Sequence, residues 1–270
     1  GYQRLFERSD TPRIDAEYLL QHVTGQSMAW LIAWNDSFAR KDHVSAFLAL
    51  LEQREQGMPI AYLLGERDFW TLTLTVNEHV LIPRPDTEAL VECALDKLPA
   101  GRALRLLDLG TGSGAIALAL AKERPLANVI AVDKHAEALA VAQQNSDRNS
   151  ITNVEFRQSD WFDQIDGRFH LIASNPPYVA PGDPHLNQGD LRFEPSTALS
   201  APNHGLADLE TIIQTAPEYL HADGWLLVEH GFEQADNVSE LFLHNGFSDI
   251  QLQRDLNGLP RCTAGKLKAL

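Results

Sequence analysis

Four consecutive residues, Asn175-Pro176-Pro177-Tyr178, offer the most specific chemistry in this sequence. A residue before proline is disfavoured in the helical region, so Asn175 is expected to be extended. The two prolines have fixed φ angles and make the backbone that follows stiff. The Asn175 side-chain oxygen and the Pro176 carbonyl oxygen can then each accept one hydrogen of an NH2 group. Tyr178 offers an aromatic surface for a flat acceptor. The tetrapeptide therefore predicts a loop that orients an amide or amine nitrogen.

Such a nitrogen is a weak nucleophile because its lone pair is delocalised into the neighbouring π system. Two fixed hydrogen bonds would aim the lone pair, and positioning of this kind contributes up to about 7–11 kcal/mol in good geometry. An activated electrophile such as a sulfonium methyl group then needs no strong general base, because the proton leaves most easily after transfer. The competing explanation is a rigid loop without chemistry, with Tyr178 packed in the core.

A glycine-rich segment forms a second candidate site. Residues 110–114, Gly-Thr-Gly-Ser-Gly, follow an apolar strand that includes Asp108, and they precede a predicted helix. Glycines allow a tight turn and close approach of backbone to a ligand. Gly110, Gly112 and Ala115 also satisfy the dinucleotide fingerprint, so a dinucleotide, S-adenosylmethionine and a turn without ligand all stay open. The candidate cofactor-binding residues here are Asp108, Gly110, Thr111, Gly112 and Gly114.

Acidic and aromatic residues after the next two strands extend this candidate site. Asp133 ends an apolar strand, where a carboxylate can accept both hydroxyls of a ribose. It could instead cap the following helix. Asp160 could bond an adenine amino group, and Trp161 could pack on the ring, although core packing explains Trp161 as well. With Asn175, these three complete the predicted cofactor residues.

The element pattern places both loops at one edge of a sheet. From about residue 84, strands and helices alternate, which predicts an α/β fold with a parallel sheet covered by helices on both faces. Open sheets of this kind bind ligands at the carboxyl ends of their strands. Strands are predicted over residues 104–109, 129–133, 154–158, 170–174, 224–229 and 247–253, with a short last strand near Cys262. Helices are predicted over residues 115–123, 136–148, 206–220 and 234–245, with Pro217 kinking or splitting the third.

The first part of the chain has a different character. Helical spacing predicts a small all-helical domain over residues 1–67, whose second helix includes Trp34. Residues 71–76 alternate polar and apolar side chains, as a half-buried strand does. We expect residues 80–82 to be its partner in a β-hairpin linker over residues 68–83, followed by the catalytic domain over residues 84–270.

Composition limits the function classes. The net charge of −15 argues against a nucleic-acid partner, because phosphate binding favours a basic surface. Only two cysteines occur, Cys93 and Cys262, neither in a C-x-x-C motif, which indicates a reducing cytoplasm and no disulfide framework. No apolar run is long enough for a membrane span. We expect a cytoplasmic monomer without a structural metal.

The combined motifs resemble a known family. Asn-Pro-Pro-Tyr after a glycine loop resembles the class I (Rossmann-like) amino-methyltransferases. Residues 82–88, Ile-Pro-Arg-Pro-Asp-Thr-Glu, and residues 192–195, Arg-Phe-Glu-Pro, are similar to the signatures of the release factor glutamine methyltransferases, the HemK or PrmC family. The resemblance covers nearly the whole chain and departs from the family pattern after residue 257, away from the candidate site.

The resemblance implies a specific reaction. A methyl group would pass from S-adenosylmethionine, leaving S-adenosylhomocysteine, to the glutamine amide in the Gly-Gly-Gln motif of class 1 peptide chain release factors. The helical domain would recognise the substrate, and Arg84 and Glu88 would border the mouth of the site. From the residues alone, Arg84 and Glu88 could equally be a surface ion pair. The implied substrate-binding residues are Asn175, Pro176, Pro177, Tyr178, Arg84 and Glu88, of which Asn175, Pro176 and Tyr178 are the catalytic candidates.

Four alternatives stay open. A related family methylates a glutamine of a large-subunit ribosomal protein but lacks the Pro-Arg-Pro-Asp-Thr-Glu signature. A DNA or RNA amino-methyltransferase fits the acidic charge poorly. An NAD-dependent dehydrogenase would leave Asn175-Pro176-Pro177-Tyr178 unexplained. A non-catalytic S-adenosylmethionine-binding module would give Asn175 no task.

Overall fold

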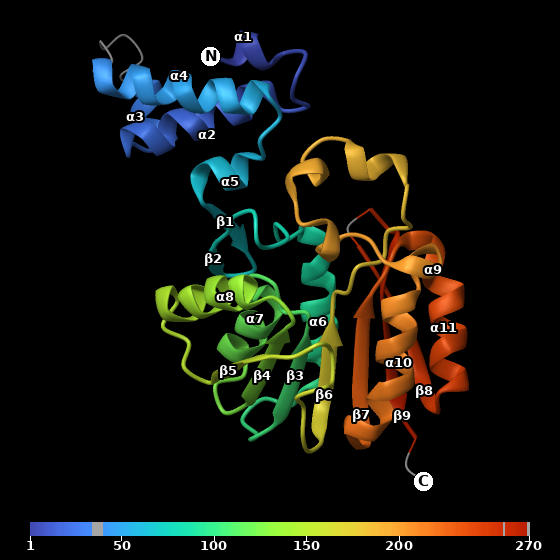
Figure 1. Ribbon diagram of the computed structural model, residues 1–270. Coiled ribbons are helices and arrows are strands. Elements are labelled where there is room, and N and C mark those ends of the chain that lie inside the picture. The colour runs from blue at the N-terminus through green and yellow to red at the C-terminus, as the bar shows by residue number, and fades with distance from the viewer. Residues whose placement is uncertain (34–39, 256, 269–270) are drawn as a thin grey trace.

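The protein consists of a helical N-terminal part and a larger α/β body. The computed structural model describes residues 1–33, 40–255 and 257–268, so that Trp34 of the predicted second helix lies outside the described residues. Figure 1 shows the first four helices stacked at one end of the molecule, with α5 and a small hairpin between them and the body. The N-terminal helices are α1 (Tyr2–Leu5), α2 (Pro12–Thr24), α3 (Met28–Ala33), α4 (Lys41–Glu55) and α5 (Ile60–Leu64).

The N-terminal helices have a small core of their own. Its buried side chains are Leu5, Ala16, Leu19 and Leu51. Helix α2 starts with proline at its first position, where the missing N–H costs nothing, and ends at Gly25 with a left-handed φ of 65°. A buried ion pair between Arg54 Nε and Asp15 Oδ2, 2.7 Å long, fastens α4 to α2. On α2, the apolar side chains of Ile14 and Tyr18 are exposed.

The hairpin differs from the prediction. Strand β1 (Glu66–Phe69) pairs antiparallel with β2 (Leu72–Thr75), so the partner precedes the predicted strand, and residues 80–82 are not a strand. Trp70, with a φ of 56°, and Thr71 make the tight turn between β1 and β2. The backbone of residues 80–82 bonds to side chains instead of to a neighbouring strand. Tyr62 donates to the Val80 carbonyl at 2.7 Å, and Glu194 accepts from the Ile82 N–H.

A seven-stranded sheet forms the body. Its strands are β3 (Arg105–Leu109), β4 (Asn128–Asp133), β5 (Val154–Gln158), β6 (Phe169–Ser174), β7 (Leu220–Glu229), β8 (Phe247–Arg254) and β9 (Pro260–Leu267). They lie in the order β5-β4-β3-β6-β7-β9-β8. The first five are parallel, and β9 enters antiparallel between β7 and β8. The order reverses between β3 and β6, which makes this pair the topological switch point.

Helices cover both faces of the sheet, so the strands are apolar on both sides. Leu106 of β3 packs into the cluster of α6 (Glu88–Lys97) and α7 (Ala115–Glu123), while its neighbour Leu107 packs into the cluster of α10 (Ala207–Tyr219) and α11 (Ala235–His244). Helix α8 (Ala136–Arg148) lies beside the hairpin. The short elements are η1 (Pro85–Thr87), η2 (Pro184–Asn187), η3 (Leu191–Phe193), η4 (Ser196–Ala198), α9 (Pro202–Gly205) and η5 (Phe232–Gln234).

The predicted α/β fold class, with helices on both faces of a mainly parallel sheet, is confirmed. Two details were wrong. The last strand is eight residues long and lies inside the sheet, because its small residues fit there: a Cβ on Gly265 would come within 2.3 Å of the Phe242 ring. Helix α10 is not split at Pro217, since the proline lies in its last turn and removes only one helical hydrogen bond.

One buried amide joins three elements beside the site. Asn145 of α8 is completely buried. Its Oδ1 accepts from the Thr75 N–H at 2.6 Å, and its Nδ2 donates to the carbonyls of Thr75 and Ser113 at 3.0 and 2.9 Å. The end of β2, helix α8 and the glycine loop are therefore held together by one side chain.

Replacing this amide should destabilise the fold. Asn145→Ala leaves three backbone groups without their partner, of which the two of Thr75 are only part-buried. Since an unsatisfied buried group costs about 1–3 kcal/mol and a part-buried one less, we expect a loss of about 2–4 kcal/mol in the free energy of unfolding. Urea denaturation measures the loss. Gln144→Ala, at the exposed neighbouring position of α8, is the matched control. Equal stability of the two variants would show that Asn145 does not hold these elements together.

Candidate active site

The glycine loop and the Asn-Pro-Pro-Tyr loop start side by side at the switch point. Strands β3 and β6 pair in parallel with Leu109 opposite Ser174, the last residues of the two strands. The Ser174 hydroxyl donates to the Leu109 carbonyl at 2.8 Å and closes this end of the ladder. Gly110 and Asn175 follow directly. Residues 65 positions apart in the sequence therefore border the same crevice.

A cavity opens between these loops. Of the predicted cofactor residues, Gly110, Thr111, Gly112, Asp133, Asp160, Trp161 and Asn175 line it. Of the predicted substrate residues, Arg84, Asn175 and Pro177 line it. Other lining residues were not predicted from the sequence; they include His79, Thr87, Lys134, His135, Pro195, Thr197 and Ala198. Thr87 and Pro195 belong to the motifs that carried the family resemblance, which was the available signal for them.

Within the glycine loop, Gly112 has room for a ligand. It has a φ of 55°, and a Cβ at this position would meet no atom within 4 Å. At Gly114 a Cβ would instead lie 3.1 Å from Leu118 and 3.3 Å from Ala142, so this glycine serves the packing of α7 on α8. Gly114 is accordingly absent from the cavity lining. The other four residues of the loop, 110–113, all line the cavity.

Asp108 lies beneath the loop rather than in the cavity. It is completely buried, and its Oδ2 accepts from the Thr111 hydroxyl at 2.6 Å and from the Ala117 N–H at 3.1 Å. Its Oδ1 has no hydrogen-bond partner among the described residues. Burial raises the pKa of this carboxyl to about 7. The structure thus places Asp108 where it shapes the loop from below.

Asp133 is held at the edge of the cavity by two backbone groups. Its Oδ2 accepts from the Gly112 N–H and its Oδ1 from the His135 N–H, both at 3.0 Å. The bond from the His135 N–H lies at the start of α8. Asp133 therefore also binds a backbone group at this helix start, in part as the helix-cap alternative predicts. Each carboxylate oxygen accepts more than one hydrogen bond. The side chain is thus fixed in place and still able to bind a diol.

The Asn-Pro-Pro-Tyr loop, the candidate catalytic loop, places its polar groups in two directions. Asn175 Nδ2 donates to the Thr87 hydroxyl oxygen at 3.2 Å, which leaves the Asn175 Oδ1 to accept from a ligand in the cavity. The Tyr178 hydroxyl instead donates to Glu229 Oε1 at 3.1 Å, and burial raises the pKa of this tyrosine. Neither Pro176 nor Tyr178 lines the cavity. Tyr178 therefore does not provide the cavity with the aromatic surface predicted for the acceptor.

Arg84 and Glu88 do not pair with each other. Arg84 forms an ion pair with Glu194, whose Oε2 also accepts from the Ile82 N–H at 3.0 Å. Glu88 Oε1 accepts from the Trp70 N–H at 2.8 Å and lies at the hairpin turn, outside the cavity lining. The surface-pair alternative was wrong because Glu194, 110 positions along the chain, supplies the carboxylate. Burial raises the pKa of Glu194 even beside this arginine.

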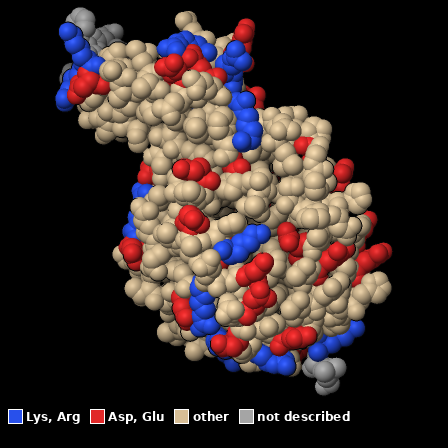
Figure 2. All heavy atoms as spheres, in the orientation of Figure 1, with Lys and Arg blue, Asp and Glu red and all other residues tan. Residues whose placement is uncertain are grey.

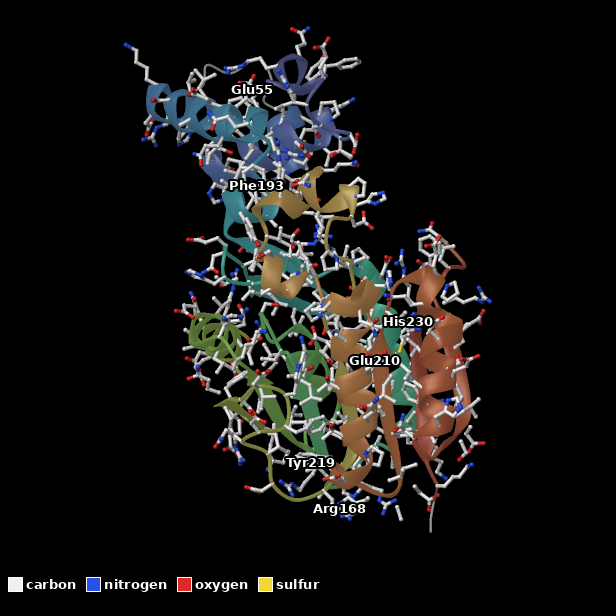
Figure 3. All side chains as sticks on the ribbon, turned by 45° about the vertical axis from the view of Figure 1, so that its right-hand side comes forward. Glu55, Arg168, Phe193, Glu210, Tyr219 and His230 are labelled. Carbon is white, nitrogen blue, oxygen red and sulfur yellow. The ribbon has the colours of Figure 1, made fainter. Side chains whose placement is uncertain are left out.

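Residues 180–199, which we call the strap, connect the cavity to the N-terminal helices. The base of the strap is closed by hydrogen bonds between Val179 and Leu199 and between Ala201 and Val179. Arg54 Nη1 reaches Asp190 at 3.3 Å, and Arg192 donates to the Gln56 carbonyl at 3.0 Å. Figure 3 shows Phe193 of the strap just below the N-terminal helices, while Tyr219 and Arg168 mark the opposite end of the body.

Comparison with known proteins agrees with this architecture. Residues 1–65 match the PrmC N-terminal domain and residues 86–191 the methyltransferase small domain. The release factor glutamine methyltransferase of Yersinia pestis is 51% identical over 97% of this chain and 94% of its own. That of Escherichia coli K12 is 47% identical over 96% and 94%. A methyltransferase structure from Pyrococcus furiosus shares the fold at a TM-score of 0.57 and 17% identity, covering 83% of this chain and 100% of its own.

No described helix has the length and apolar character needed to cross a bilayer. Within residues 1–33, 40–255 and 257–268, no cluster of three or more histidine, cysteine or acidic side chains is arranged as metal ligands.

Asp108 should make stability depend on pH. Between its usual pKa near 4 and the folded value of about 7, the folded protein keeps a proton that the unfolded chain releases, so the free energy of unfolding falls as pH rises. Asp108→Asn cannot titrate. Relative to wild type, its free energy of unfolding should rise by about 2 kcal/mol from about pH 5.5 to about pH 8.

Urea denaturation at several pH values checks this expectation. Glu218→Gln, at an exposed position of α10, is the control and should follow the wild-type pH dependence. If Asp108→Asn followed the same curve as this control, the buried carboxyl would not titrate as its surroundings indicate.

Proposed function

The chain belongs to the family of release factor glutamine methyltransferases, and on this basis we propose that it methylates the glutamine amide in the Gly-Gly-Gln motif of class 1 peptide chain release factors, using S-adenosylmethionine. It is a protein-glutamine methyltransferase with the class I fold. The finer parts of the proposal are the cofactor, the roles of the site residues and the way in which the substrate docks.

One observation carries the proposal. The Asn175 amide lies at the cavity wall with its Nδ2 bound to Thr87, so its oxygen is available to a donor in the cavity. A glutamine side chain presents such a donor, an NH2 group with two hydrogens. The Asn175 Oδ1 and the Pro176 carbonyl would each accept one of them.

The cavity has features that fit S-adenosylmethionine. Gly112 presents an open approach on the glycine loop, and Asp133 stands next to it with lone pairs for ribose hydroxyls. Asp160 and Trp161 border the same cavity, where they would meet the adenine. When bound, the cofactor supplies a methyl group already activated by a sulfonium charge. We therefore assign cofactor binding to Gly110, Thr111, Gly112, Asp133, Asp160 and Trp161, with Asp108 and Gly114 shaping the loop.

The residues of the catalytic loop would act by positioning. Two acceptors hold both amide hydrogens of the glutamine and turn its lone pair toward the electrophile, which reduces the delocalisation that makes an amide unreactive. The amide nitrogen becomes more acidic once it carries the methyl group, so its proton can pass to solvent without a dedicated base. Tyr178, held by Glu229, would fix the end of the loop.

The competing substrates find less support. Figure 2 shows basic side chains dispersed among acidic ones on the visible face, without the continuous basic surface that nucleic-acid binding favours. The curated relatives reported above are named for release factors rather than for ribosomal proteins. A cytoplasmic location and a monomeric state remain part of the proposal, since release factors act in translation.

We assign substrate docking to the N-terminal domain, with the predicted division at residues 1–67, 68–83 and 84–270. Ile14 and Tyr18 lie one turn apart on α2 and are each about half exposed, at 50% and 51%. Large apolar side chains exposed on one helix face are typical of protein contact surfaces. The strap links these helices to the cavity, so a docked protein could reach both.

Asp133→Ala tests the cofactor assignment. It should weaken S-adenosylmethionine binding by about 1.5–3 kcal/mol, the range for hydrogen bonds to a charged group. Isothermal calorimetry measures the affinity. Glu137→Ala, an exposed acid in the first turn of α8, controls for loss of charge. Unchanged affinity in Asp133→Ala, or tighter binding of NADH than of S-adenosylmethionine by wild type, would contradict the assignment.

Asn175→Ala tests the reaction. Single-turnover methyl transfer from labelled cofactor to intact release factor should fall about 10²–10³-fold, the cost of losing a preorganised hydrogen bond, while cofactor affinity changes little. Asn175→Asp keeps an acceptor and should show intermediate activity. Asn237→Ala, exposed on α11, is the control. The same assay with a ribosomal protein, DNA and RNA, and with a release factor carrying glutamate in place of the motif glutamine, identifies the substrate.

The docking assignment requires a change in KM. Replacing both Ile14 and Tyr18 by serine should raise the KM for intact release factor by about 10-fold, as expected for losing part of an apolar contact. The transfer rate at saturation and the cofactor affinity should stay the same. Leu126→Ser removes an exposed leucine from the body, 61% accessible, and is the control. If the α2 variant kept the wild-type KM, this face would not be the docking surface.

A further inference from the structure

A side-chain amide outside the cavity lining binds the last residue of the Asn-Pro-Pro-Tyr loop. Gln234 ends η5, and its Nε2 donates to the Tyr178 carbonyl at 3.0 Å and to the His204 carbonyl at 3.1 Å. Its Oε1 accepts from the Gly231 N–H at 2.9 Å. All three partners are backbone groups, each of which can only donate or only accept. The Gln234 amide can therefore be turned in only one way.

The sheet explains how Gln234 reaches a residue 56 positions away. Strands β6 and β7 pair in parallel with Ser174 opposite Val228, so the catalytic loop leaves the sheet beside the end of β7. Element η5 follows the same end of β7, directly after Gly231 and close to His230, which Figure 3 labels. The Gln234 N–H also donates to the Gly231 carbonyl at 2.9 Å. Gln234 is therefore fixed to the start of η5 through its backbone as well as its side chain.

A left-handed turn packs against the same point of the loop. Its residues Asn203, His204 and Gly205 have φ angles of 52°, 55° and 82°. Such angles strain residues other than glycine and persist only where the surrounding structure imposes them. Asn203 Nδ2 donates at 2.8 Å to Glu210 of α10, which Figure 3 labels. A Cβ on Gly205 would overlap the Tyr178 carbonyl oxygen, so the turn lies directly against that oxygen. The turn and the amide of η5 therefore confine the same carbonyl.

The stiffness of the loop transmits the position of this carbonyl to the proposed acceptors. At its start the loop is fixed by the Ser174 hydroxyl. The two prolines that follow Asn175 have fixed φ angles, so few torsions between the two anchors can change. A displacement of the Tyr178 carbonyl must then move the Pro176 carbonyl, and the Asn175 backbone with it. A misplacement of about 1 Å in an active site can lower a rate by about 100-fold.

Building on the function proposed above, we propose that Gln234 is a positioning residue for methyl transfer, which fixes the Pro176 carbonyl and the Asn175 side chain relative to the substrate amide. Gln234 does not touch the reacting atoms and acts through the Tyr178 carbonyl. Tyr178 has other anchors besides this one. Its hydroxyl donates to Glu229, and the N–H of the next residue donates to the base of the strap. Loss of the Gln234 amide should therefore displace the loop without unfolding it.

Two variants of Gln234 in the full-length enzyme test this role. Gln234→Met has nearly the same length but no donor. Gln234→Glu keeps an acceptor for the Gly231 N–H but has an oxygen in place of the donating NH2 group. We expect the single-turnover rate with saturating release factor to fall about 10–100-fold in both, the scale of a small misplacement in an active site. Cofactor affinity, measured by calorimetry, should not change. A wild-type rate in either variant would overturn the proposal.

The matched control is Asn237→Asp. Asn237 is exposed on α11, close to Gln234 in the sequence, so this change adds the charge of Gln234→Glu at the surface. It should keep the wild-type rate. Circular dichroism and urea denaturation show whether each variant folds. If neither Gln234 variant folded, the amide would serve the fold rather than the reaction, and the proposal would be wrong.

A double-mutant cycle separates positioning from a general structural role. If Gln234 acts by placing Asn175 and its neighbour, part of its effect is lost when the Asn175 side chain is absent. Adding Gln234→Met to Asn175→Ala should therefore lower the rate by a factor at least about threefold smaller than in the wild-type background. Losses that simply multiply would show that the two side chains act independently, which would contradict the proposal.

A measurement without substrate distinguishes this proposal from the function on which it rests. In nitrogen-15-labelled protein, the backbone amide resonance of Val179 responds to hydrogen bonds at the Tyr178 carbonyl, because both belong to one conjugated peptide group. It should shift in Gln234→Met and Gln234→Glu and stay in place in Asn237→Asp. If wild type failed to methylate release factors but these shifts appeared, only the proposed function would fail. An unchanged Val179 resonance in both Gln234 variants would refute the anchoring of the loop.

Discussion

The parallel pairing of β3 with β6 is the constraint on which the site depends. Leu109 and Ser174 are opposite each other at the ends of these strands, so the glycine loop and the Asn-Pro-Pro-Tyr loop begin next to one another. The strand order reverses at this pair, which leaves a crevice between the elements that follow. A shift of one residue in the register would turn each strand's side chains to the opposite face and separate the two loops.

Three buried acids then refine the geometry that the sheet provides. Asp108 supports the glycine loop, Glu194 holds Arg84 and the Ile82 N–H at the cavity mouth, and Glu229 holds Tyr178. Burial is the main cause that raises the pKa of each. Such groups destabilise the fold relative to apolar residues, but they orient their partners in only one way. Here they fix the loops around the cavity.

The strap connects the proposed docking surface to the proposed site. It leaves the sheet directly after the catalytic loop and returns beside it, closed at its base by backbone hydrogen bonds. Between these points it contacts Arg54 and Gln56 of the helical part and carries Glu194 back to the cavity. A protein bound to the N-terminal helices would therefore lie near the strap, whereas the residues proposed for the chemistry all belong to the body.

The sequence by itself determined the α/β fold, nearly all of its strands and helices, and the two loops that border the cavity. These features have local signals: apolar periodicity, glycines at a strand end, and prolines after Asn175. Only the tertiary structure decided that Arg84 pairs with Glu194 and that Glu88 serves the hairpin. It also decided that β9 lies inside the sheet and that Tyr178 turns away from the cavity to donate to the buried Glu229. These contacts join residues far apart in the chain. An acidic residue at the end of a strand also has the same local sequence pattern whether its side chain is buried or faces solvent.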